Sequence, residues 1–189
     1  MAFATMTACT SEDASEVMNH ETTDMRLVFM PYDVEPMTLT RAAVADYATR
    51  LDVWIYEGDT EVQAVHQQST DDDFASLSVT LEKAKTYTVY AVAHKAAGVA
   101  TLTNGVVAWP DDKVTHSFWY TATFSPATTT TLNCLMERIV GNFRLIITDE
   151  VPDGVTRMTV SMGLSPTRWD IAGYGVNPQE RVSTFTPAA

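Results

Sequence analysis

Basic residues and cysteines are scarce in this chain, and each shortage excludes a class of function. The 189 residues include 12 lysines and arginines against 24 aspartates and glutamates, which gives a net charge of −12. With no basic patch to offset this charge, binding to nucleic acid or to anionic lipid head groups is disfavoured. The two cysteines, Cys9 and Cys134, are too far apart in sequence for a CxxC redox motif or a zinc knuckle.

Catalytic signatures are missing as well. The sequence contains no GxSxG, Walker-type or GxGxxG motif, and its four histidines show no HxxxH or HExxH spacing. Asp71-Asp72-Asp73 clusters carboxylates of the kind that bind calcium, but it lacks the alternating spacing and the glycine of an EF-hand loop. No carboxylate pair is singled out for glycoside hydrolysis. We therefore predict a non-catalytic protein that uses no metal or cofactor.

No segment is predicted to span a membrane. Val114–Met136 is the longest stretch without Asp, Glu, Lys or Arg, and its length is about that needed to cross a bilayer. It contains seven threonines as well as serine, proline and asparagine, and is too polar for a hydrocarbon core. We expect a strand and a loop there.

What the sequence does contain is a succession of short segments in which polar and apolar residues alternate, the pattern of half-buried strands. Turn signals such as Gly58-Asp59 and Asn104-Gly105 separate them. Thr38–Thr49 is rich in alanine, which favours helix, but the segment is short and uncapped, so we expect an exposed connection with a helical turn. These features predict an all-β fold, an antiparallel β-sandwich. The predicted strands are Met25–Met30, Arg50–Glu57, Thr60–Gln67, Phe74–Glu82, Thr86–His94, Val106–Trp109 and Ser117–Phe124.

The alternation assigns one set of side chains to a common core and another to the opposite face. Trp54 and Trp119 fall on that opposite face, where exposed indoles would make a sugar-stacking platform together with Trp109 and Trp169. A second layer that covers Trp54 and Trp119 is the favoured alternative. The predicted core comprises Leu51, Val53, Ile55, Leu77, Val79, Leu81, Val89 and Ala91.

Two histidines also fall on predicted strands. His66 and His94 are expected to be hydrogen-bonded structural residues, because no ligand partner stands at a suitable spacing.

The chain divides into three parts. Residues 1–23 are expected to form the remnant of a lipoprotein signal and a flexible tether, because Thr10–Asp24 is polar and acidic and shows no apolar periodicity. Residues 24–125 form the predicted sandwich. Residues 136–189 are too few to bury a stable core alone, so we expect the start of an incomplete second β-sandwich.

Met136–Val151 marks the start of this second domain. It contains a strongly alternating predicted strand, Phe143–Thr148, and a turn and a second strand, Thr156–Met162, follow it. Beyond Ser165, prolines and glycines are frequent, and only Arg181–Phe185 has the pattern of a strand.

The two cysteines stand in unlike contexts. Cys134 is expected to be a small buried apolar residue. Cys9 follows Ala8 and precedes a polar, acidic stretch, an arrangement similar to a bacterial lipoprotein junction, in which the cysteine is acylated after cleavage. Only Met1–Ala8 precede it, without a basic region or a full apolar region, so this interpretation places the start of the chain inside its signal peptide. The alternative is an unstructured N-terminus with an incidental cysteine.

Five segments together resemble the Bacteroidales fimbrial subunits, and within that superfamily the FimB-type minor or anchor subunits. The resemblance covers about residues 9–165. It implies a lipoprotein anchored through Cys9, with two tandem transthyretin-like β-sandwiches, that is displayed at the outer membrane and serves adhesion. The segments are Cys9–Asp13 (CTSED), Arg50–Tyr56 (RLDVWIY), Leu77–Leu81 (LSVTL), Thr86–His94 (TYTVYAVAH) and Arg138–Pro152 (RIVGNFRLIITDEVP).

The resemblance also implies partners. Subunits of this superfamily join when a strand of one fills a groove in the next, so other fimbrial subunits are the expected partners. In related shaft pilins an Arg-specific protease cuts near the connection that follows the first strand, and Thr40-Arg41-Ala42 resembles that site loosely, which makes Arg41 a candidate protease-sensitive residue. Anchor-type members keep the first strand. We therefore expect Met25–Met30 to be retained and the partner to be engaged elsewhere, in the second domain.

The alternative function is that of a surface lipoprotein whose sandwich binds glycans. Glycan binding that depends on Trp54 or Trp119 would favour this alternative, whereas capture of fimbrial shaft subunits would favour the fimbrial hypothesis.

Overall fold

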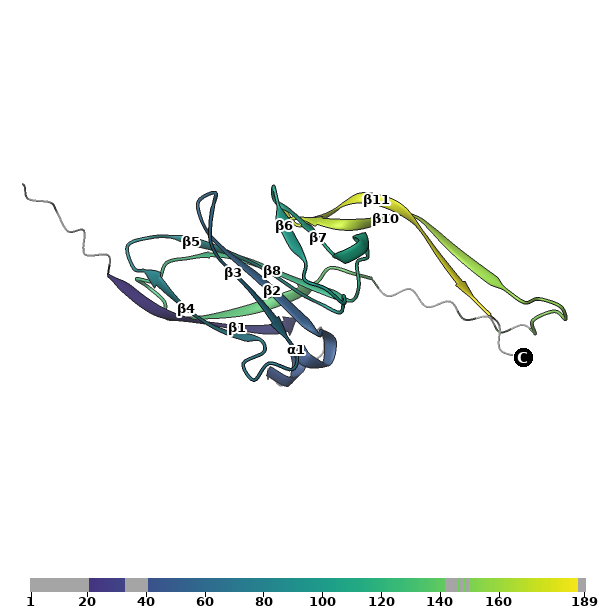
Figure 1. Ribbon diagram of the computed structural model, residues 1–189, viewed down its shortest axis with the longest axis horizontal. Coiled ribbons are helices and arrows are strands. Elements are labelled where there is room, and N and C mark those ends of the chain that lie inside the picture. The colour runs from purple at the N-terminus through teal and green to yellow at the C-terminus, as the bar shows by residue number, and fades with distance from the viewer. Residues whose placement is uncertain (1–20, 33–40, 142–145, 147, 149, 187–189) are drawn as a thin grey trace, which may run out of the picture.

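The computed structural model describes residues 21–32, 41–141, 146, 148 and 150–186 (Figure 1). The predicted strand Phe143–Thr148 lies mostly outside these residues and stays a prediction. Strands dominate the described chain, and the all-β prediction is confirmed. The elements are β1 Thr22–Tyr32, α1 Arg41–Tyr47, β2 Arg50–Glu57, β3 Thr60–Gln68, β4 Ser76–Glu82, β5 Tyr87–His94, β6 Thr101–Thr103, β7 Val106–Ala108, a short 3-10 helix Pro110–Asp112, β8 Ser117–Phe124, β9 Thr131–Arg138, β10 Met158–Asp170 and β11 Tyr174–Phe185.

A seven-stranded sheet in the order β3-β2-β5-β8-β9-β1-β4 folds back on itself to make the sandwich. The sheet bends between β8 and β9, where only two residue pairs are in register. As a result β3-β2-β5-β8 forms one layer of the sandwich and β9-β1-β4 forms the other. Apolar side chains of both layers meet in one core. All eight residues predicted for this core are buried, none more than 6% exposed.

The prediction of antiparallel pairing is wrong for one pair of strands. β9 lies parallel to β1, in register from Arg26↔Thr131 to Tyr32↔Glu137, while β4 pairs with β1 on its other side in antiparallel fashion. A parallel pair needs a long crossover, and here the crossover is most of the domain, which no local pattern reveals. β9 therefore belongs to the sheet of the sandwich, although it lies beyond the range 24–125.

A second sheet of four strands, in the order β11-β10-β7-β6, covers the outer face of β2, β5 and β8. Trp54 and Trp119 lie in the core between these sheets and are 3% and 7% exposed. The expectation that a second layer covers them is confirmed. At one end of this layer, Asn104 and Gly105 form the β6–β7 turn with φ of 49° and 74°, as the Asn-Gly signal predicts.

β10 and β11 form a long hairpin that extends well beyond the sandwich (Figure 1). The prediction that only Arg181–Phe185 is a strand in this region is wrong. Pro166 and Pro178 face each other in register, so the two missing N–H donors fall at the same place in the ladder. A Cβ on Gly175 would lie 2.6 Å from the ring of Pro166, so only glycine fits at this position.

The one α-helix among the described residues, α1, has seven residues, about two turns, and so is longer than the helical turn expected in Thr38–Thr49. Within the described ranges no helix has the length and apolar character that a bilayer crossing requires.

We expect Val53→Asp to lower the free energy of unfolding by about 3 kcal/mol or more, because it places an unpaired charge in the sandwich core. The matched control is Val62→Asp on β3, where the side chain is 43% exposed and the change should cost less than about 0.5 kcal/mol. Urea denaturation of both variants measures the difference, and equal midpoints would show that the assigned core is wrong.

Candidate functional site

The two site residues predicted from sequence fall at or beyond the edge of the described chain. Cys9 lies outside the described residues. Arg41 is the first residue of α1, and residues 33–40 before it lie outside the description. Lipidation at Cys9 and protease sensitivity at Arg41 therefore stay predictions.

Cys134 is fully buried in the sandwich core, as expected for a small apolar residue. Burial raises the pKa of its thiol to about 12. A thiol with this pKa is not a nucleophile at neutral pH.

The proposed tryptophan platform is not available at the two positions that suggested it. Trp54 and Trp119 are packed under the second sheet, and Trp109 is 3% exposed. Trp169, on β10, is only partly buried and packs against the same core. Buried indole faces cannot stack on a sugar, so a glycan site on Trp54 or Trp119 would require the second sheet to leave.

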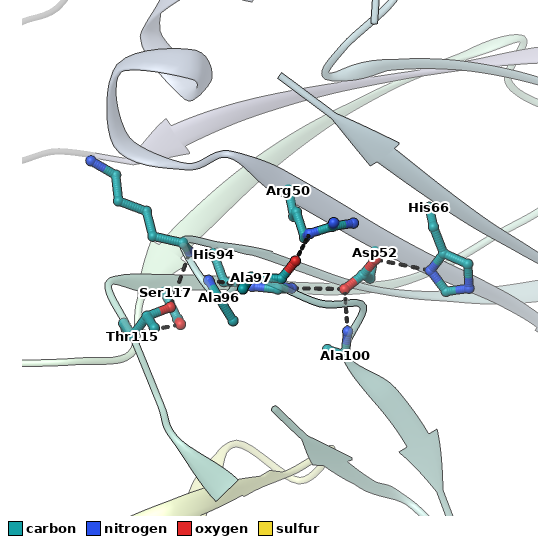
Figure 2. Close-up of polar contacts among 10 residues, drawn as sticks. Arg50, Asp52, His66, His94, Ala96, Ala97, Ala100, Thr115 and Ser117 are labelled. Carbon is teal, nitrogen blue, oxygen red and sulfur yellow. Dashed lines mark hydrogen bonds and ion pairs between the residues drawn. The ribbon is translucent and has the colours of Figure 1, made fainter. Parts of the chain in front are cut away.

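The most polar buried feature is a cluster around the carboxylate of Asp52, which is 0% exposed (Figure 2). Asp52 lies on β2, on the face opposite the sandwich core. Its Oδ1 lies 2.9 Å from Nδ1 of His66 on β3, and its Oδ2 lies 2.7 Å from Nε2 of His94 on β5. The backbone N–H of Ala100 donates to the same Oδ2 at 2.7 Å.

The hydrogen bonds of His94 fix the role of each ring nitrogen. The backbone N–H of Ala96 donates to Nδ1 at 3.1 Å, so Nδ1 is an acceptor and Nε2 carries the hydrogen that is donated to Asp52. The segment Ala96–Ala100 is thereby tied to β2 and β5 at both of its ends. Asp52 thus holds the segment that leads from the sandwich into the second sheet.

An aspartate that holds a histidine ring is also the arrangement that orients a general base. Within the described chain, however, no serine or cysteine side chain is hydrogen-bonded to His66, whose side chain is 37% exposed. We assign the cluster a structural role, which agrees with the expectation of hydrogen-bonded structural histidines at His66 and His94. The sequence pattern does not identify Asp52 as the centre of the cluster, because a charged residue on the outer face of a strand is ordinarily exposed.

The Asp71-Asp72-Asp73 loop connects β3 to β4. Oδ2 of Asp71 accepts a hydrogen bond from the backbone N–H of Gln68, and the side chain of Gln67 bonds to the backbone of Asp73, Ala75 and Ser76. No group of three possible ligands able to hold a metal ion occurs among the residues the structure describes. The acidic loop closes the corner between the two layers.

The sheet edges differ in how they are protected. β4 is an edge of the seven-stranded sheet, and Ser76–Leu81 contain no charged residue, no proline and no register shift against β1. The opposite edge, β3, carries Glu61 and a register shift at Ile55/Tyr56. Charge, proline and bulges are the usual means by which edges are protected from added strands, so β4 is the less protected of the two.

A cavity of about 590 Å³ lies where the β10–β11 hairpin meets the end of the sandwich. Three of its described lining residues are arginines, Arg138, Arg168 and Arg181, and none is acidic. Arg168 donates to both oxygens of nearby Asp112, at 2.8 and 3.2 Å, and these bonds hold the pKa of the Asp112 carboxyl below its usual value. We call this feature the arginine cavity.

Replacing Asp52 by alanine tests the structural role of the cluster. Asp52→Ala leaves the buried donors of His94 and Ala100 without an acceptor, and should lower the free energy of unfolding by about 3 kcal/mol or more. Asp24→Ala is the control, because the exposed Asp24 also accepts a 2.7 Å hydrogen bond, from Thr80, and its loss should cost less than about 0.5 kcal/mol. Chemical denaturation gives both values, and a similar small cost for both variants would refute the structural role.

No family model matches the chain, and no curated protein sequence matches it. The fold is shared with the crystal structure of a "putative adhesin" from Bacteroides ovatus, with a TM-score of 0.58 and 12% sequence identity. The similarity covers 85% of this chain and 62% of the Bacteroides ovatus chain, so the present chain spans less than two thirds of that protein. At this identity the similarity establishes a common fold.

Proposed function

We propose that this protein is a non-catalytic subunit of a cell-surface adhesive fibre, a fimbrial anchor or accessory subunit that joins its neighbours by strand addition. Three observations support the proposal. They are the resemblance to the FimB-type subunits, the fold shared with the "putative adhesin", and the unprotected edge at β4. The β4 edge is the observation on which the proposed strand addition depends.

The first strand is held on both sides, which favours an anchor over a polymerising shaft subunit. β1 pairs with β4 and with β9, and Met25, Leu27 and Phe29 are buried in the sandwich core. A shaft subunit must lose this strand to open a groove. Here the groove between β4 and β9 is filled by the chain itself, so a partner needs another edge.

β4 offers that edge. Its inward-facing residues Leu77, Val79 and Leu81 are buried, while Ser78 and Thr80 are small, uncharged and exposed. An added strand would gain main-chain hydrogen bonds along β4 without meeting a charge before Glu82. In the second sheet β6 has three residues, and β11 carries Pro178 and Glu180. The geometry therefore favours β4 over the second sheet, where the sequence-based hypothesis had placed the contact.

Site-specific photo-crosslinking tests the contact in cells that assemble the fibre. A photoreactive amino acid at Ser78 on β4 should give an adduct with a second fimbrial subunit. The same amino acid at Ala64, an exposed position in the middle of β3, should give little or none. Equal yields at both positions would count against the β4 edge. Adducts that form only after trypsin cleaves at Arg41 and releases β1 would identify a polymerising pilin instead of an anchor.

The proposal places the protein at the outer membrane through a lipid on Cys9, with the following residues as a tether. Its basis is the lipoprotein-like sequence at Cys9 and the family resemblance. The acidic character of the tether suits a segment that must stay solvated between the membrane and the sandwich.

Acylation of Cys9 predicts a specific labelling pattern. The full-length precursor, expressed in a bacterium with lipoprotein-processing enzymes, should incorporate a palmitate analogue and partition into detergent. Cys9→Ala should abolish both properties, and Cys134→Ala should change neither, because its thiol is buried in the core. Label that persists in Cys9→Ala rejects the anchor at this residue.

A further inference from the structure

The two layers of the sandwich have unequal numbers of strands. Among the described strands, one layer has four, β3-β2-β5-β8, and the other has three, β9-β1-β4. The sheet bends between β8 and β9, so counting away from the bend places β1 opposite β5 and β4 opposite β2. No described strand then lies opposite β3. The position across from β3, beside the β4 edge, is a vacant strand position.

The burial of inward-facing side chains agrees with this arrangement. Leu51, Val53 and Ile55 on β2 are at most 1% exposed. Val65 and Gln63 are the partners of Val53 and Ile55 on β3 and share their face of the sheet. Both are only partly buried, although Val65 packs against the sandwich core. The inner face of β3 therefore overhangs the β4 edge and is incompletely covered.

The vacant strand position is closed at one end. The side chain of Gln67, which is 4% exposed, bonds to the backbone of Asp73, Ala75 and Ser76 in the connection from β3 to β4. The two strands run away from this connection side by side in opposite layers. Along the uncharged stretch Leu77–Leu81 of β4, an added strand of about five residues would fit.

The chemistry around the vacant strand position is uncharged. The inward side chains are Leu77, Val79 and Leu81 on β4 and Gln63 and Val65 on β3. A charged side chain that faced them would lose its water without gaining a partner, whereas a hydroxyl or amide could hydrogen-bond to the amide of Gln63. The occupant is therefore a strand whose inward side chains, at alternate residues, carry no charge.

The overhang of β3 also restricts what can pair with β4. The edge of a folded sandwich brings a second layer about 10 Å behind its own strand. If the β4 edges of two copies paired, the β3 strand of each copy would meet the β2 strand of the other. A second copy could fill the position only with its own β3, whose edge carries Glu61 and a register shift. A single extended strand has no layer behind it and meets neither obstacle.

We propose that the β4 edge accepts one extended segment of another subunit, a tail or linker outside any sheet, which lies across from β3 with uncharged side chains toward Gln63 and Val65. This inference rests on the proposed function and specifies the strand that β4 takes. The overhanging β3 acts as a selector, because it admits a single strand and obstructs the edge of a second sandwich.

Photo-crosslinking from the two faces of β3 tests the proposal in cells that assemble the fibre. Gln63 and Ala64 are neighbours whose side chains point to opposite faces. A photoreactive amino acid at Gln63 should give an adduct with the same subunit that Ser78 captures, in a yield at least fivefold above that from Ala64. An adduct at Ser78 with no more at Gln63 than at Ala64 would overturn this inference and leave strand addition at β4 intact. No adduct at either Ser78 or Gln63 would refute the proposed function itself.

Mass spectrometry of the adducts identifies the occupant. The captured peptide should lie outside the strands of the partner's folded domain. A peptide from β3 of a second copy, or from a strand within a partner's sheet, would overturn the proposal.

A charge on the inner face of β3 gives an independent measurement. Gln63→Glu should lower the yield of the Ser78 adduct at least fivefold, because the added strand would bury the new carboxylate, while Ala64→Glu should lower it less than twofold. Thermal melts show whether each variant is folded. If Gln63→Glu is not, Gln63→Lys decides, with the same expected loss. An unchanged yield in the folded Gln63 variant, or an equal loss in Ala64→Glu, would refute the position across from β3.

Discussion

The constraint on which the rest of the structure depends is that the β2-β5-β8 layer is buried on both faces. One face packs against β9, β1 and β4, and the other is covered by the second sheet. Such a layer must be apolar in both directions, which explains why Trp54, Val92 and Trp119 lie on its outer face. Any charge within it has to be fully hydrogen-bonded, and Asp52 meets this condition with two histidines and a backbone N–H.

This constraint also determines where the molecule can meet other molecules. Because both faces of the central layer are occupied, β2, β5 and β8 offer no face to another molecule, and contacts are left to the outer faces of the other layers, the sheet edges and the junction between sheets. Among the described strands, β4 is the less protected edge of the seven-stranded sheet, and the junction holds the arginine cavity. None of the described residues that line the cavity belongs to β4.

Much of the sandwich was predictable from the sequence, because alternation of polar and apolar residues is a local signal. It identified β2, β4, β5 and β8 and every residue assigned to their common core. It also favoured a cover over Trp54 and Trp119. The parallel pairing of β9 with β1 was not predictable, since the partners are about a hundred residues apart and alternation says nothing of direction.

The remaining differences arise where long-range pairing decides the outcome. Pro166 and Pro178 are ordinarily strand breakers, but opposite each other they are compatible with one hairpin. From the sequence alone Asp52 is expected on the surface. Its burial depends on hydrogen bonds from His94 on β5 and from Ala100 in the segment after β5. The arginines of the arginine cavity come from three strands, and the net charge of −12 for the whole chain does not predict that they lie together. Cys9 and most of Phe143–Thr148 lie beyond what the structure describes.

The parallel pairing of β1 with β9 has a mechanical consequence. The chain enters β1 at its N-terminal end, near Thr22, and leaves β9 at the opposite end of the pair, near Arg138. Tension between these two points acts along the strands. It therefore loads all the main-chain hydrogen bonds between β1 and β9 at the same time, in shear. In an antiparallel pair these two ends would lie side by side, and the same tension would break the hydrogen bonds between the strands one after another. A sandwich built in this order resists traction applied between the N-terminal end of β1 and the C-terminal end of β9.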